Sequence, residues 1–115
     1  MPLSKIPEYG IHFDVCIMSF VQNDWITYSC PVKYREYLAL GKPIVSVPII
    51  EVERTYGCPA SVTSTHNDFI AACVSEMAND SIEKRLSRRA LVEHWTWDRT
   101  TELVSKAIQE ALRSN

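Results

Sequence analysis

The sequence predicts an α/β fold: a Rossmann-like, partial parallel sheet with flanking helices and a C-terminal helix. Residues 14–20 and 43–48 are short, almost continuous apolar runs, and such runs are typical of strands buried within a parallel sheet. A helical segment bounded by Pro31 and Gly41 separates them. The order strand, helix, strand implies parallel strands joined by a right-handed crossover.

The helix between the two strands carries signals for its start and its end. Residues 21–29 are polar and aromatic, and we expect them to form a loop. Pro31 suits the first turn of the helix, where its missing N–H is no loss. Ser29 or Cys30 is then the expected N-cap residue, with Ser29 the better chemical choice. Gly41 is suited to the left-handed conformation that ends many helices.

Further elements are expected after the second strand. Residues 51–57 suit one short helical turn, and residues 61–64 suit a short edge strand. Three helices should follow, each opened by a start signal: Thr65, Asp80 and Thr96. Their apolar faces comprise Phe69, Ile70, Cys73, Val74 and Met77 in the first, Ile82, Leu86 and Ala90 in the second, and Leu103, Val104, Ala107, Ile108, Ala111 and Leu112 in the third.

The number of strands indicates how much of a domain the chain contains. Two strands are well marked and a third is short, whereas a doubly wound domain has five or more. A sheet this small leaves an edge that requires a neighbour. We therefore expect residues 1–115 to form a single partial domain, the second half of a larger one.

Composition excludes several classes of function. The net charge is −2 and the pI is near 5.9, so the chain lacks the basic surface of a nucleic-acid-binding protein. The cysteines contain no C-x-x-C pair and the histidines do not fall at zinc-finger spacing, which argues against a structural metal. Buried free thiols in a reducing cytosol fit Cys16, Cys30, Cys58 and Cys73 better than disulfides do.

The sequence shows no feature of export or of a membrane span. The N-terminal residues contain no apolar segment that resembles a signal peptide. The most apolar stretch, residues 37–50, is interrupted by glycine, lysine and two prolines, so it does not suit a bilayer. We therefore expect a cytoplasmic protein.

The junction that precedes the first long helix is the candidate binding site. The loop after Phe20 lies at the carboxyl end of a strand, where ligands of open α/β sheets bind. A helix N-terminus supplies free N–H groups for a phosphate, and Lys33 adds a positive charge. Glu36 shares a face with Lys33 and can accept hydrogen bonds from two ribose hydroxyls. Alternatively, Lys33 and Glu36 form an ordinary surface ion pair.

Other conspicuous side chains have simpler interpretations. Trp25 and Tyr28 can stack on a base or sugar, or can pack down as loop anchors. We expect His12 and His66 to have no catalytic role. His94, Trp95 and Trp97 suggest packing where the last helix turns back, and residues 83–89, rich in lysine and arginine, suggest a solvated helix face.

The segment Pro-Val-Lys-Tyr-Arg-Glu-Tyr-Leu-Ala-Leu-Gly-Lys-Pro-Ile-Val-Ser-Val-Pro, residues 31–48, resembles the pattern P-x-K-x-x-E-Y-L-A-x-G-K-P-V-V-S. This pattern belongs to the C-terminal, donor-binding domain of GT-B-fold glycosyltransferases of the group 1, family 4 type. Residues 13–20, 50–52 and 97–99 are similar to the family's D-V-x-I-x-P-F, P-E-V and W-x-x-R segments, in the same order. The resemblance covers roughly residues 7–112.

The resemblance implies transfer of a sugar from a nucleoside diphosphate sugar to a hydroxyl acceptor, with no metal required. Glu36 would bind the ribose and Lys33 the diphosphate, assisted by the helix-start amides. The implied donor-binding residues are Phe20, Tyr28, Ser29, Cys30, Val32, Lys33 and Glu36. Many members have a glutamate near the donor sugar where this chain has Tyr28, and Ser19 replaces the usual proline.

The same resemblance implies two partners besides the donor. An N-terminal domain would supply the acceptor site and the catalytic groups, so this chain by itself would turn over little or nothing. Because many such enzymes act on membrane-bound acceptors, the basic helix face would also suit peripheral contact with anionic lipid at the inner side of a membrane. Two alternatives stay open: a non-catalytic α/β module that binds a protein partner through its sheet edge or last helix, and a phosphate-binding domain of another α/β family.

Overall fold

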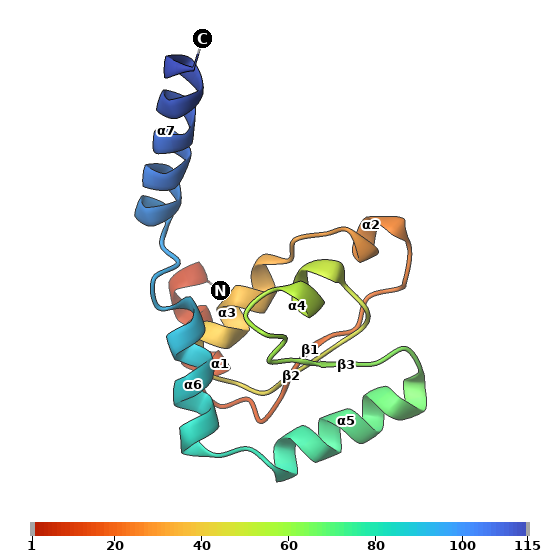
Figure 1. Cartoon of the computed structure of the whole chain (residues 1–115). Coiled ribbons are helices and arrows are strands. Elements are labelled where there is room, and N and C mark those ends of the chain that lie inside the picture. Colours follow the sequence, from red (N-terminus) through yellow and green to blue (C-terminus); the bar gives the residue numbers. More distant parts are fainter. Residues whose placement is uncertain (1, 115) are drawn as a thin grey trace.

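The structure is a computed structural model and describes residues 2–114. Three parallel strands, β1 (Cys16–Met18), β2 (Ile44–Ser46) and β3 (Ser61–Val62), form one sheet in that order. The helices are η1 (Leu3–Lys5), α1 (Ile6–Gly10), α2 (Asp24–Thr27), α3 (Val32–Ala39), α4 (Ile50–Arg54), α5 (His66–Ala78), α6 (Ile82–Val92) and α7 (Trp97–Arg113) (Figure 1). The predicted α/β fold with a parallel sheet and a C-terminal helix is confirmed.

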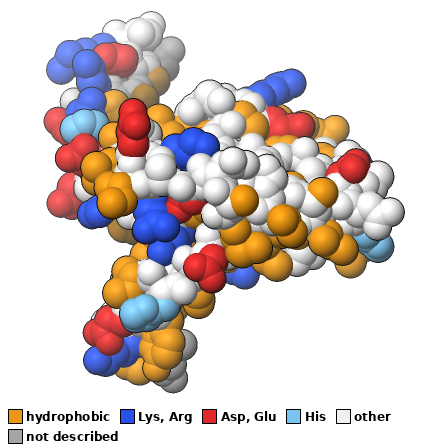
Figure 2. Space-filling view, turned by 90° about the horizontal axis from the view of Figure 1, so that it is seen from below, with side chains coloured by type: hydrophobic (Ala, Val, Ile, Leu, Met, Phe, Trp, Pro, Cys, Tyr) orange, Lys and Arg blue, Asp and Glu red, His pale blue; other side chains and the backbone are white. Residues whose placement is uncertain are grey.

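The two faces of the sheet are covered to different extents. Cys16 and Met18 of β1 are buried on the side of α3, in register with Ile44 and Ser46. Ile17 points to the opposite face beside Val45 of β2. Helix α5 packs over β2 and buries Val45 completely, whereas Ile17 stays 45% exposed. The face of β1 on the α5 side is therefore uncovered. Figure 2 shows that hydrophobic side chains are exposed on the face of the molecule that it draws.

Helix α3 packs on the sheet through Tyr34 and Leu38, which are one turn apart and completely buried. The Tyr34 hydroxyl donates to the carbonyl oxygen of Val52 at 3.4 Å. The helix ends as predicted: Gly41 has a φ of 74°, and the N–H of Lys42 donates to Tyr37 O at 3.2 Å. This is a Schellman ending, in which a left-handed glycine lets the chain reverse toward β2.

The start of α3 differs from the prediction. Pro31 is itself the N-cap, with φ −71° and ψ 122°, and no side chain caps the helix. The Ser29 hydroxyl donates instead to Ile26 O at 2.8 Å, at the end of α2. Helix α2 is also a difference, because it lies within the expected loop 21–29. It forms because the Asn23 side chain caps it by accepting from the N–H of Ile26.

The predicted N-caps of the last three helices are correct for α5 and α7 and wrong for α6. Thr65 and Thr96 cap α5 and α7 through their hydroxyls, as expected. The cap of α6 is Ser81 and not Asp80, because the Ser81 hydroxyl accepts from the N–H of Lys84. Asp80 binds arginine side chains of α6 instead. Serine and aspartate are comparable caps, so only the geometry decides between neighbours.

The contact face of α6 combines Arg88 with Val92, which is 8% exposed and belongs to the core. Arg88 is 6% exposed, and its Nη1 atom donates to Asp80 Oδ1 at 2.7 Å and to Gly41 O at 3.1 Å. The prediction of a solvated basic face is therefore wrong for Arg88. The predicted apolar face is also wrong, since Ile82 and Leu86 are exposed. Arg88 joins α6 to the end of α3 because the carbonyl group of Gly41 needs a donor there.

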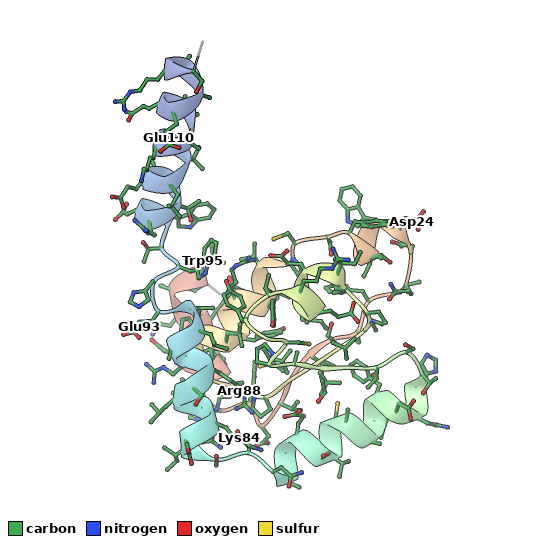
Figure 3. All side chains as sticks on the ribbon, viewed as in Figure 1. Asp24, Lys84, Arg88, Glu93, Trp95 and Glu110 are labelled. Carbon is green, nitrogen blue, oxygen red and sulfur yellow. The ribbon has the colours of Figure 1, made fainter. Side chains whose placement is uncertain are left out.

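The C-terminal helix α7 projects away from the sheet and does not turn back on it (Figure 1). Trp97 is 84% exposed, and none of the residues of α7 is buried. The predicted packing therefore fails for Trp97. It holds in part for Trp95, which lies before α7 (Figure 3) and meets the Tyr56 ring edge-on, with 6.4 Å between the ring centroids. No described helix is both long enough and apolar enough to cross a membrane.

The four cysteines are free thiols, as expected, but Cys30 is exposed and does not fit the prediction of buried thiols. Cys16 lies in the core, and burial raises the pKa of its thiol to about 11, partly opposed by Lys42. It is therefore protonated and unreactive at neutral pH.

Replacing Gly41 by alanine should destabilise the fold by more than about 2 kcal/mol, because the left-handed conformation costs about 1–2 kcal/mol and the new Cβ would clash. This Cβ would lie 2.9 Å from the backbone oxygen of Arg85. Gly57 is the matched control, because its φ is 72° and a Cβ added there would meet no atom within 4 Å. Urea unfolding of Gly41→Ala and Gly57→Ala checks this, and equal losses would contradict it.

Acid should weaken the contact between Asp80 and Arg88. Burial alone would raise the pKa of Asp80, but hydrogen bonds from Arg88 and Arg85 outweigh it and lower the pKa below the ordinary 3.8. The stability that Asp80 contributes is thus complete above its unfolded pKa and is lost as pH falls through the lower folded value. Asp80→Asn should cost about 3 kcal/mol at pH 7 and flatten the acid limb below about pH 4. Urea unfolding at a series of pH values across this range measures both effects. An unchanged acid limb would refute the role of Asp80.

Candidate functional site

The predicted binding residues lie around the exposed N-terminus of α3. Burial of Tyr34 and Leu38 turns Lys33 and Glu36 to the opposite, exposed side of the helix. Lys33 Nζ lies 5.8 Å from the centroid of the Phe20 ring, a cation–π contact. The structure therefore brings together Phe20 from the end of β1 and Lys33 from the first turn of α3.

The alternative in which Lys33 and Glu36 form a surface ion pair is not realised. The ion pairs among the described residues involve neither side chain. Both charged groups are therefore available to a ligand from the same side of α3. The absence of a side-chain cap also leaves the first N–H groups of α3 free.

The other predicted binding residues have different surroundings. Tyr28 and Val32 are exposed, whereas Ser29 is engaged with the end of α2. Cys30 Sγ accepts from Arg35 Nη1 at 3.3 Å. Trp25 is also exposed, so it does not act as a loop anchor. The Tyr28 and Val32 side chains therefore stay accessible, with no bonded partner among the described residues, whereas Ser29 and Cys30 are engaged by other residues.

Arg35 anchors the start of α3 to the segments that follow β2. Its Nη2 atom donates to Glu51 Oε1 at 2.7 Å, and its guanidinium lies 5.8 Å from the Tyr56 ring centroid and 5.1 Å from that of Trp95. Burial alone would lower the pKa of Arg35, but its hydrogen bonds to Glu51, Cys30 and Tyr56 outweigh burial and raise the pKa. Arg35 thus stays charged and holds the helix start in place.

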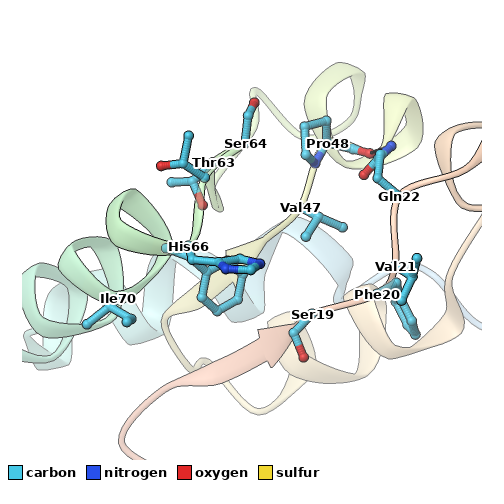
Figure 4. Close-up of a pocket in the computed structure, with 12 residues that line it drawn as sticks. Ser19, Phe20, Val21, Gln22, Val47, Pro48, Thr63, Ser64, His66 and Ile70 are labelled. Carbon is cyan, nitrogen blue, oxygen red and sulfur yellow. Dashed lines mark hydrogen bonds between the residues drawn. The ribbon is translucent and has the colours of Figure 1, made fainter.

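A pocket of about 810 Å³ opens at the carboxyl ends of all three strands. Figure 4 shows Phe20 and Val21 on one side of it and Thr63 and His66 on the other. The position fits the rule that ligands of open α/β sheets bind beyond the strand ends. We call it the strand-end pocket. Phe20 belongs both to this pocket and to the contact with Lys33.

Most of this pocket is not predicted by the sequence. The local pattern indicates no role for His66 and does not single out Val47, Thr63 or Ser64, yet all four line it. The sequence does contain a signal for these residues. Each of them follows a strand, and the residues that follow parallel strands meet at one edge of the sheet. The distance between these segments in the sequence hides their proximity.

One buried polar atom in this region has no partner. The Thr63 Oγ1 atom is buried and makes no hydrogen bond, which holds for no other buried side-chain nitrogen or oxygen in residues 2–114. An unsatisfied buried group of this kind marks a place where water or a ligand is expected.

Nothing in the described residues forms a group of three or more metal-ligating side chains. Comparison of the chain with protein-family models, with curated proteins and with solved structures finds no match. The family resemblance of residues 31–48 and the roles that it implies therefore stay predictions.

Replacing Thr63 by valine should stabilise the ligand-free chain by about 1 kcal/mol, because it removes an unsatisfied buried hydroxyl and keeps the shape of the side chain. The backbone bond from Thr63 N to Ser46 O, 3.0 Å long, is unaffected. Thermal and urea unfolding measure the effect. A less stable variant would show that ordered water already satisfies the hydroxyl.

Proposed function

We propose that the chain is the nucleotide-binding part of a glycosyltransferase that transfers a sugar from a nucleoside diphosphate sugar to a hydroxyl acceptor. The observation that carries the proposal is the placement of Lys33 and Glu36 on one exposed side of α3, outside every ion pair of the described residues. A diphosphate at the helix start would receive the free N–H groups, the partial positive charge of the helix and the Lys33 ammonium. The Glu36 carboxylate, one turn along, suits two adjacent ribose hydroxyls.

The chemistry assigned to these residues is stabilisation of the leaving group. As the bond between the sugar and the diphosphate breaks, negative charge grows on the diphosphate, and fixed donors stabilise that charge. Arg35 supports this function indirectly, because it holds the start of α3 through Glu51. The acceptor site and any catalytic base belong to the N-terminal domain that the resemblance implies. The isolated chain is therefore expected to bind a nucleotide but not to turn over.

A nucleotide panel tests the proposal. Ligand-observed NMR with UDP, GDP, ADP and inorganic phosphate should detect binding of one nucleoside diphosphate. Lys33→Ala and Glu36→Ala should each weaken it by about tenfold or more, because each removes a charge-assisted hydrogen bond. Glu53→Ala, which removes an exposed carboxylate on α4, is the control and should change nothing.

The outcomes separate the proposal from its rivals. Binding of phosphate as strong as that of the nucleotides, unaffected by Glu36→Ala, would favour a general phosphate-binding domain. If neither this chain nor a longer product of the parent gene binds a nucleoside diphosphate, the proposal is wrong.

A second candidate is a non-catalytic module that binds a protein partner. The exposed apolar stripe of α7 favours it, since four large side chains there are 46–71% exposed: Leu103, Val104, Ile108 and Leu112. Apolar surface of this kind marks interaction sites in many proteins. This candidate predicts a stable complex through α7 and no affinity for nucleotides.

A further inference from the structure

We propose that the strand-end pocket receives the sugar of the nucleoside diphosphate sugar and selects an uncharged sugar with an apolar substituent, such as an N-acetyl or a deoxy-methyl group. This inference rests on the proposed function, because it assigns the substrate class of the same site. It concerns the pocket side chains and not the residues of α3.

The position of Phe20 connects the pocket to the diphosphate site. Phe20 lines the pocket and lies 5.8 Å from Lys33 Nζ, measured to the ring centroid. Glu36 lies one turn further along α3. The order ribose, diphosphate and sugar within the ligand then matches the order Glu36, Lys33 and Phe20 in the protein. A diphosphate held by Lys33 directs its sugar past Phe20 toward the strand ends.

The composition of the pocket sets the charge of the sugar. Its lining contains no lysine, arginine, aspartate or glutamate among the described residues. His66 is the one lining side chain that can carry a charge, so a carboxylate or phosphate on the sugar would lose hydration there with no other ionic partner, which is unfavourable. Much of the wall is apolar, from Val47 and Pro48 after β2 and from Phe69 and Ile70 on α5. A methyl or acetyl group gains from burial against such a wall.

Two polar groups are ready for sugar hydroxyls. Gln22 Nε2 donates to Thr27 Oγ1 at 2.8 Å and to Pro48 O at 3.0 Å, so both of its N–H groups are used. The carboxamide oxygen of Gln22 is thereby held as an acceptor at the pocket. Thr63 adds a hydroxyl that has no partner among the described residues and that is buried, so a sugar hydroxyl reaches it only when the side chain rotates.

The pocket also accounts for a departure from the family pattern. Tyr28 occupies the position at which many members have a glutamate near the donor sugar, and it is exposed and not part of the pocket lining. We therefore assign the sugar contacts to the residues that line the pocket. A volume of about 810 Å³ falls within the range of small-molecule sites and leaves room for a substituted ring.

Binding affinities of matched ligands test the inference. The probes are the nucleoside diphosphate that binds best and its esters with glucose, N-acetylglucosamine and glucuronic acid. The N-acetylglucosamine ester should bind about tenfold more tightly than the diphosphate alone, and the glucuronic acid ester should show no gain.

Two substitutions on α5 locate the effect. Ile70→Asp places a charge in the pocket wall, whereas Val74→Asp places it one turn further along the same helix, outside the pocket. The two positions are 63% and 59% exposed, so both variants are expected to fold, which circular dichroism verifies. Ile70→Asp should abolish the gain from the N-acetylated sugar without changing binding of the diphosphate, and Val74→Asp should change neither.

The possible results separate failure of this inference from failure of the proposed function. If the diphosphate binds through Lys33 but the three esters gain nothing, or the charged ester binds most tightly, the pocket does not select the sugar and only this inference fails. The same conclusion follows if Ile70→Asp and Val74→Asp have equal effects. If no diphosphate binds at all, the proposed function fails as well.

Discussion

The packing of α3 on the sheet through Tyr34 and Leu38 is the contact on which the candidate site depends. Both side chains are completely buried, and the helical period then directs Lys33 and Glu36 outward. The same contact places the first turn of α3 beside Phe20, at the end of β1. The proposed diphosphate site therefore depends on a core contact and not on a specialised loop.

Two arginines hold the ends of this helix in place. Arg35 binds Glu51 near the start of α3, and Arg88 binds Asp80 and the carbonyl oxygen of Gly41 at its end. Breaking such a pair is costly, because it leaves one charge poorly hydrated. Arg88 and Asp80 are buried, whereas Arg35 and Glu51 are partly exposed, so the pair at the end of α3 contributes more to fixing its orientation.

Two apolar surfaces stay exposed outside the core. Ile17 lies on a part of the sheet that α5 does not reach, and the apolar stripe of α7 lies outside the core cluster. A single layer of three strands cannot shield both of its faces with the helices present. The expectation of a partial domain with a neighbouring element at β1 stays a prediction.

Local signals in the sequence determined the order of the strands, their parallel pairing, the caps Thr65 and Thr96, and the left-handed end at Gly41. The caps and the helix end depend on residues within one turn of each other, whereas the parallel pairing follows from the strand, helix, strand order along the chain. Tertiary structure decided what local patterns could not show: the burial of Arg88 against Gly41, 47 residues away, and the meeting of three strand ends in one pocket. It also decided that Ser29 binds Ile26 and does not cap α3. For Arg88 and Ser29, the three-dimensional arrangement decides which partner the polar group binds, because the nearby sequence contains several equally good candidates.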